Sequence, residues 1–176
     1  MTIVKQKMPW RTFFLRAGVA LVLIVGSITY FQARYTVGID DQVIRCLDPY
    51  RLFLIDHWGG SSPAKGKIFA FHARGMEPHR ADGTVVIKEI AGVPGDHIVV
   101  TPDETLINGI KVGGGVEALS EKLETSPEDL AKDFVLKDGE YFFMGWHPRS
   151  FDSRYWGVVD QSQLIGKATP LPIMKG

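Results

Sequence analysis

One segment restricts the fold of this chain more than any other: an apolar run without a charged residue over residues 17–33. Residues 13–15 are also apolar, and the long side chain of Arg16 can extend along them toward the polar headgroups of a bilayer. The extended segment reaches about 20 residues, which is enough to cross the bilayer core as a helix. We therefore predict one transmembrane helix over residues 13–33.

The residues on both sides of this run predict its orientation. Aromatic side chains suited to membrane interfaces stand near its two ends, at Trp10 and at Tyr30 and Phe31. Basic residues precede the run and acidic residues soon follow it, which predicts residues 1–12 in the cytoplasm and residues 34–176 outside it. A cleaved secretory signal shares this pattern. The end of the run lacks the pair of small residues that a cleavage site needs, so we favour a retained anchor.

The remainder of the chain has the composition of a mostly β domain. It is rich in turns and aromatic residues, with 19 glycines and 11% aromatic residues, and helix-period segments are few. The 20 acidic and 20 basic residues balance, which argues against nucleic acid as a partner. Cys46 is the only cysteine, so an intramolecular disulfide is excluded.

Short apolar segments bounded by glycine, proline and aspartate predict the strands. They cover residues 51–56, 67–72, 84–91, 97–100, 105–112 with an Asn-Gly hairpin turn, 141–145 and 164–171. Residues 116–134 break this pattern, and Ser126-Pro127 followed by two acidic residues is typical of a helix start. We predict a small helical insertion there, which is either a substrate or partner surface or a solvated decoration.

Lys88 is the only cation in the strand over residues 84–91, and apolar or β-branched side chains flank it. Such an ammonium group has two fates. It can reach water at the edge of a sheet, or it can be desolvated and lose its proton near neutral pH. The second state is the one that a lysine general base needs.

Two further motifs accompany the lysine strand. Cys46 precedes a proline-containing turn after the predicted membrane span, and residues 150–157 read Ser-Phe-Asp-Ser-Arg-Tyr-Trp-Gly. Together with the lysine strand and its Gly-Val-Pro-Gly-Asp turn at residues 92–96, these motifs resemble the type I signal peptidases of peptidase family S26, which are membrane-anchored Ser/Lys endopeptidases. The resemblance covers nearly the whole chain and points in particular to the short conjugative-transfer branch, the TraF-type peptidases.

The resemblance implies a fold of coiled antiparallel sheets and a catalytic dyad. Lys88 would be the general base, Cys46 stands at the position of the nucleophile, and the Ser150 hydroxyl would orient the lysine amine. The backbone N–H of Cys46 would stabilise the oxyanion. The thiolate would attack the scissile carbonyl and form a thioester, which water would later resolve.

Four more residues match positions that support the site in this family. Asp152 and Arg154 would form a structural ion pair beside the dyad, and Ser153 and Gly145 would shape the backbone around it. The resemblance implies no cofactor and no metal.

The chain departs from the family pattern at the nucleophile. The family has a serine, one hydrophobic residue and then a proline, whereas this chain has Cys46 with two residues before Pro49. A thiol ionises more easily than a hydroxyl and is the better nucleophile, so it can replace the serine in principle. Ser62 is the alternative, but it lies in a glycine-rich loop beyond the expected place, so we favour Cys46. Gly66-Lys67 also replaces a Gly-Asp pair, and residues 146–148 replace an asparagine-containing segment.

Two other classes of function compete with this interpretation. One is a Cys/His hydrolase, but no histidine forms a recognisable pattern with Cys46, and the histidines lack the spacing of zinc ligands. These histidines are His57, His72, His79, His97 and His147. The other is a catalytically inactive relative that serves as a membrane-tethered binding or assembly factor, which the missing serine favours.

We therefore predict a single-pass endopeptidase of the bacterial inner membrane with its catalytic domain in the periplasm. It would cleave signal or leader peptides of exported precursor proteins beside the membrane lipid. By analogy with the family branch, a pilin-like subunit or another component of the conjugation machinery is the expected substrate or partner.

Overall fold

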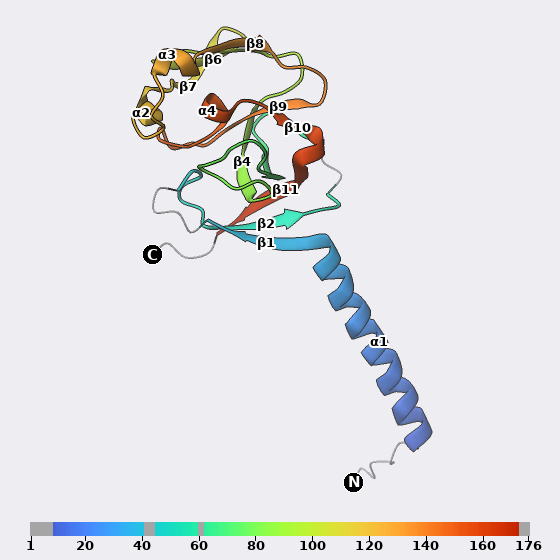
Figure 1. The fold of residues 1–176 in the computed structure, drawn as a ribbon. Helices are drawn as coiled ribbons and strands as arrows, with labels where there is room; N and C mark the ends of the chain where they lie inside the picture. The colour runs from blue at the N-terminus through green and yellow to red at the C-terminus, as the bar shows by residue number, and fades with distance from the viewer. Residues whose placement is uncertain (1–8, 41–44, 60–61, 173–176) are drawn as a thin grey trace. The chain divides into compact units, whose positions relative to one another are not determined.

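The computed structural model describes residues 9–40, 45–59 and 62–172. It divides the chain into two compact units, residues 1–35 and 36–176, and each is described here by itself. Figure 1 shows the long helix of the first unit and the β-rich second unit. Part of the predicted cytoplasmic segment, residues 1–8, lies outside the described residues.

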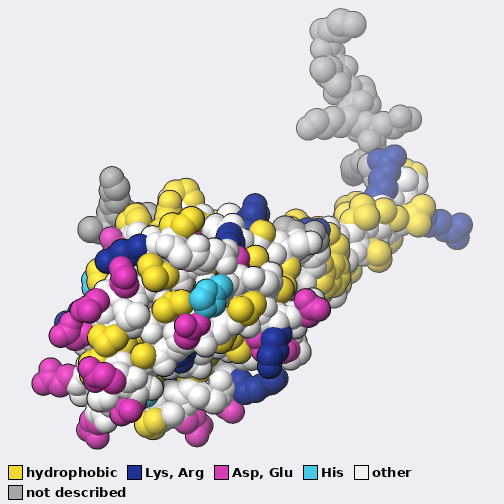
Figure 2. Space-filling model, turned by 90° about the horizontal axis from the view of Figure 1, so that it is seen from above, with side chains coloured by type: hydrophobic (Ala, Val, Ile, Leu, Met, Phe, Trp, Pro, Cys, Tyr) yellow, Lys and Arg dark blue, Asp and Glu magenta, His cyan; other side chains and the backbone are white. Residues whose placement is uncertain are grey.

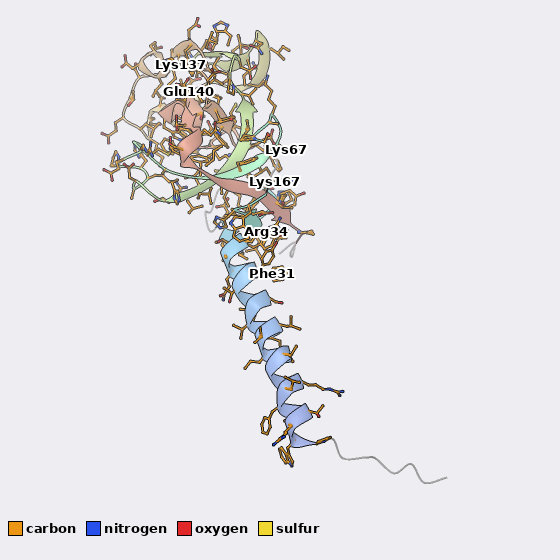
Figure 3. All side chains as sticks on the ribbon, turned by 90° about the vertical axis from the view of Figure 1, so that its right-hand side faces the viewer. Phe31, Arg34, Lys67, Lys137, Glu140 and Lys167 are labelled. Atoms are coloured by element: carbon orange, nitrogen blue, oxygen red, sulfur yellow. The ribbon has the colours of Figure 1, made fainter. Side chains whose placement is uncertain are left out.

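Helix α1 (Trp10–Arg34) contains the whole predicted span of residues 13–33. It begins after Pro9, which lacks the N–H that a helix interior needs, and it ends where Tyr35 takes an extended conformation. None of its residues is buried in the structure, and Phe31 and Arg34 lie near its C-terminal end (Figure 3). Among the described residues, this helix alone is long and apolar enough to cross a bilayer, although a signal sequence would have the same character.

Two antiparallel sheets make up the second unit, so the prediction of a mostly β fold is confirmed. The larger sheet has the strand order β1 (Tyr35–Ile39), β2 (Leu52–Asp56), β11 (Leu164–Leu171), β3 (Ile68–His72), β4 (Val85–Gly92), β9 (Glu140–Met144) and β10 (Val159–Asp160). The smaller sheet has the order β7 (Ile110–Gly114), β6 (Glu104–Ile107), β5 (His97–Val100) and β8 (Lys132–Val135).

Strand β9 joins the hydrophobic cores on its two sides. Phe143 packs in a cluster with Phe69 and Phe71 of β3, whereas its neighbours Phe142 and Met144 pack against the smaller sheet. Successive side chains of a strand point to opposite faces, so a strand buried on both faces reads as one continuous apolar run. This is why residues 141–144 are all apolar and all buried.

The segment predicted as a small helical insertion contains two short helices and ends in a strand. Residues 116–134 contain two helices of a single turn, α2 (Glu117–Ser120) and α3 (Pro127–Leu130), and the segment then enters strand β8. Ser126 caps α3 as its sequence indicated, since its hydroxyl accepts a hydrogen bond from Asp129 N. Pairing with β5 makes the last part extended, because Phe134 lies opposite Ile98.

A buried carboxylate closes the turn after β4. Asp96 accepts hydrogen bonds from Val93 N, Lys65 Nζ and Asn108 Nδ2, each at 2.8 Å. Burial by itself would raise the pKa of Asp96, but the hydrogen bonds from Lys65, Val93 and Asn108 outweigh it and lower the pKa below its ordinary value. The turn thereby connects the end of the lysine strand to the hairpin of the smaller sheet.

Candidate active site

Lys88 is buried in the larger sheet, where it pairs with β3 and where the pairing of β4 with β9 begins one residue later, at Glu89. Strand β4 is flanked by β3 and β9, and Lys88 stands opposite Phe69 of β3. The strand alternates between buried and half-buried residues, which places Lys88 on the same face as Val86 and Ile90. Its side chain is only 3% exposed. The fold therefore keeps the Lys88 side chain away from solvent.

The amine of Lys88 has a defined partner in the Ser150 hydroxyl. Lys88 Nζ donates a hydrogen bond to Ser150 Oγ over 2.9 Å, and both groups are buried. Their residues are 62 positions apart in the chain. A buried hydroxyl that accepts a hydrogen bond restricts the rotamers of the lysine and aims its nitrogen.

The turn that carries Cys46 is held against the same region from both sides. Leu47 is 1% exposed and packs into a core cluster with Phe53 and Ile55. The carbonyl oxygen of Cys46 accepts hydrogen bonds from Trp146 N at 2.7 Å and from His147 N at 3.4 Å. Side-chain packing and backbone hydrogen bonding thus fix the position of Cys46 relative to the strand that carries the lysine.

Gly145 lets these parts approach one another. A Cβ atom at this position would lie 2.2 Å from Ser150 Oγ and 3.0 Å from the Cys46 carbonyl oxygen. Real Cβ atoms do not approach other atoms so closely, so a side chain here would displace the hydroxyl that holds Lys88. Position 145 therefore requires glycine, because Ser150 and the Cys46 carbonyl lie too close for a side chain.

Cys46 and Lys88 both line one pocket of about 220 Å³. The thiol-bearing residue is half-buried, and residues 84–88 form one wall of the pocket. A bound peptide could therefore meet the thiol and the amine together, which is the arrangement that nucleophilic catalysis with a lysine base requires.

Asp152 and Arg154 form a buried ion pair beside Ser150. Arg154 Nε and Nη2 donate to the two carboxylate oxygens of Asp152 over 2.7 and 2.8 Å, and the side chains are 2% and 0% exposed. Burial alone would lower the pKa of Arg154, but the hydrogen bond and negative charge of Asp152 raise it above its ordinary value. The guanidinium also donates to Ser150 O and Gly114 O, so it ties the serine loop to the smaller sheet.

Side-chain oxygens after β9 hold the backbone of that strand. Asp152 Oδ2 accepts a hydrogen bond from Gly145 N at 3.0 Å, and Ser153 Oγ accepts one from Phe143 N at 2.9 Å. Asp152 also caps the single-turn helix α4 (Ser153–Trp156) by accepting from Arg154 N. These hydrogen bonds from the Ser-x-Asp-Ser-Arg motif therefore fix the backbone at Gly145 and next to Ser150.

Two residues near the site were not expected from the sequence. Trp146 donates its ring N–H to Glu89 at 2.5 Å and packs edge-on against Tyr50, so it braces the Cys46 turn. Arg80 lines the pocket that contains Cys46 and Lys88. Its segment has neither strand nor helix periodicity, so no local pattern pointed to it.

The alternative candidate residues lie in other surroundings. Ser62 is exposed in the loop before β3, close in sequence to Lys67, which directly precedes that strand (Figure 3). His57, His72 and His97 are hydrogen-bonded to Thr36, to the Gly83 carbonyl and to Asp133. The His79 ring packs against Phe151, and His147 Nδ1 accepts from Arg149 N. Structural partners therefore account for these five histidines.

The buried ion pair makes Arg154 a strong determinant of stability. Replacing it by leucine leaves the Asp152 carboxylate buried without a counter-charge, which should lower the free energy of unfolding by about 3–5 kcal/mol. The matched control is Arg149→Leu, since Arg149 is an exposed arginine in the same loop, and it should stay within about 0.5 kcal/mol of the wild type. Urea unfolding of the full chain in detergent micelles measures both. A loss below about 1 kcal/mol for Arg154→Leu would contradict the assigned role.

Comparison with known proteins gives a consistent result. The chain matches the signal peptidase, peptidase S26 family over residues 10–171. It is 28% identical over 158 residues to the probable signal peptidase I-2 of Synechocystis sp., covering 85% of this chain and 66% of that protein. It is 26% identical over 162 residues to signal peptidase I of Leptolyngbya laminosa, covering 86% and 73%. For signal peptidase IB of Staphylococcus aureus the values are 26% over 118 residues, 60% and 58%.

A solved structure is also similar in sequence. The crystal structure of a signal peptidase I from Enterococcus faecalis V583 is 30% identical and aligns with a TM-score of 0.39, covering 62% of this chain and 98% of that one. The family match extends from the start of α1 to the end of β11 and includes every residue of the candidate site. The chain therefore belongs to the signal peptidase family, peptidase family S26.

Proposed function

We propose that this protein is a membrane-anchored endopeptidase of the signal peptidase I type that removes leader peptides from exported proteins. One observation carries the proposal. The Lys88 amine is buried and hydrogen-bonded to Ser150, and Lys88 lines a pocket together with Cys46. An amine held in this way beside a nucleophile is the central requirement of dyad catalysis.

The first chemical step uses the neutral form of Lys88. Lys88 Nζ takes the proton of the Cys46 thiol, and the thiolate sulfur attacks the scissile carbonyl carbon to form a tetrahedral oxyanion. The backbone N–H of Cys46 is the proposed donor to this oxyanion. Ser150 keeps the amine in place while its charge changes.

The second step releases the two products. The oxyanion collapses, the C–N bond breaks, and the lysine ammonium returns its proton to the leaving amine, which leaves a thioester on Cys46. Lys88 then takes a proton from water, whose oxygen attacks the thioester carbonyl. The acid product departs, and the thiolate regains its proton from Lys88.

The edge of β4 supports the binding of an extended substrate. Strand β9 pairs with β4 from Glu89 to Gly92, whereas β3 pairs with the opposite edge from Val85 to Glu89. Within the described strands, the β9-side edge from Val85 to Lys88 is therefore unpaired, and these residues line the pocket. A peptide laid along this edge would gain backbone hydrogen bonds and present a carbonyl near the dyad.

The proposal also includes a cellular place and a substrate. Helix α1 would anchor the protein in the bacterial inner membrane with its N-terminus in the cytoplasm, and the peptidase domain would lie in the periplasm. The resemblance to TraF-type peptidases supports a pilin-like precursor and contact with conjugation machinery. The face shown in Figure 2 carries interspersed acidic, basic and apolar side chains, which suits protein substrates better than nucleic acid.

The test is cleavage by the full chain in detergent micelles. One reaction contains an exported pilin precursor and another contains an unrelated secreted precursor, and mass spectrometry identifies the new N-terminus. We expect a single cut between leader and mature sequence. The Ser62→Ala variant should cleave within about twofold of the wild-type rate, because the exposed Ser62 side chain has no part in the proposed site.

Each outcome separates one part of the proposal from another. If only the unrelated precursor is cleaved, the proposed peptidase activity is supported and the proposed specificity for pilin is wrong. Binding of a precursor without cleavage overturns the enzymatic proposal and favours a binding or assembly factor. Loss of cleavage in Ser62→Ala would identify Ser62 as the nucleophile in place of Cys46.

A further inference from the structure

The candidate pocket extends well beyond the dyad. It runs along β4 from Lys88 to Val85 and on to Thr84, and Arg80 also belongs to its lining. Each residue of a strand advances the chain by about 3.3 Å, so Thr84 lies about 13 Å from Lys88 along the strand direction. An extended peptide bound beside this strand would cover that distance with about four residues.

Arg80 lies near the Thr84 end of the pocket, because its neighbour Ala81 accepts a hydrogen bond from Thr84 N at 3.2 Å, and its turn is anchored in the core. Met76 is 4% exposed within a core cluster, and its carbonyl accepts hydrogen bonds from His79 N at 3.1 Å and Arg80 N at 3.0 Å. The His79 ring also packs against Phe151 in the loop that carries Ser150. The position of Arg80 is therefore coupled to the site by packing.

Among the residues that the structure describes, Arg80 takes part in no ion pair, in contrast to the buried Arg154. Its residue is half-buried, which weakens screening by solvent, and a guanidinium offers a planar set of donors suited to a carboxylate. A cation placed in this way in a substrate pocket favours an anionic side chain.

We propose that Arg80 selects precursors with an aspartate or glutamate about three to five residues from the scissile bond. This inference rests on the proposed peptidase function and adds a substrate class to it. The carboxylate would accept hydrogen bonds from the guanidinium while the peptide backbone lies along β4. Asp40 lines the same pocket, and its negative charge opposes the binding of an acidic residue.

The experiment measures kcat/KM for precursor variants with glutamate, glutamine or lysine at single positions two to six residues from the cut, on either side of it. At one position three to five residues away, the wild type should cleave the glutamate variant about tenfold faster than the lysine variant. Arg80→Glu should invert this order, and Asp40→Asn should increase the wild-type preference. The matched control is Arg74→Glu, because Arg74 is an exposed arginine in the same segment and does not line the pocket.

The outcomes distinguish this inference from the proposed function. If the wild type cleaves every variant at the same rate, the peptidase stands and the role of Arg80 is wrong. The role is also wrong if Arg80→Glu keeps the wild-type order, or if Arg74→Glu inverts it as strongly as Arg80→Glu does. If no variant is cleaved at all, the proposed function itself fails. Cleavage of the lysine variant by Arg80→Glu also demonstrates that this variant is folded.

Discussion

Replacing Lys88 by methionine is expected to lower the rate of precursor cleavage by about 10³-fold or more, because the general base is lost. Methionine has a similar volume and suits the apolar surroundings of a side chain that is 3% exposed, so the fold should persist. The measurement is single-turnover cleavage by the purified full chain. Lys67→Met, which changes an exposed lysine just before the neighbouring strand, should leave the rate unchanged.

Lys88→Arg tests the chemical role of the amine more sharply. Arginine can still donate a hydrogen bond to Ser150, but its guanidinium stays protonated and accepts no proton from a thiol. We expect this variant to be as inactive as Lys88→Met. If it retained more than about a tenth of the wild-type rate, Lys88 would act as a hydrogen-bond donor and not as the base.

The second large effect is expected at Cys46. Cys46→Ala should lower the cleavage rate by about 10³-fold or more, because no atom remains to form the acyl intermediate. Cys46→Ser should retain part of the activity, since Lys88 can also deprotonate a hydroxyl, although the oxygen is the poorer nucleophile and is placed differently from sulfur. The same single-turnover assay measures both variants.

The single cysteine of the chain gives this prediction an independent test. A thiol-alkylating reagent should inactivate the wild type and leave the remaining activity of Cys46→Ser unaffected. If Cys46→Ala cleaved at the wild-type rate while Lys88→Met did not, the nucleophile would lie elsewhere. Ser62→Ala in the Cys46→Ala background would then be the next variant to measure.

The apolar helix and most strands were predictable from sequence, because their signals are local. The run over residues 17–33 is apolar whatever surrounds it, and the segment over residues 84–91 is rich in β-branched side chains and ends in a turn with glycine, proline and aspartate. The end of the segment over residues 116–134 could not be predicted from local signals. Its last residues are extended because they pair with β5, and the sequence of the segment does not identify this partner.

The sequence by itself determined which residues could carry the chemistry: a thiol, a lysine in an apolar strand and the Ser-x-Asp-Ser-Arg motif. Only the tertiary structure decided that Lys88 is buried, and only the folding of distant segments brings Ser150 within 2.9 Å of its amine. The same applies to Arg80, whose segment has no periodicity and whose place at the pocket follows from the anchoring of Met76. Periodicity reports which side of an element is buried, whereas contacts between distant segments depend on strand pairing and packing over the whole domain.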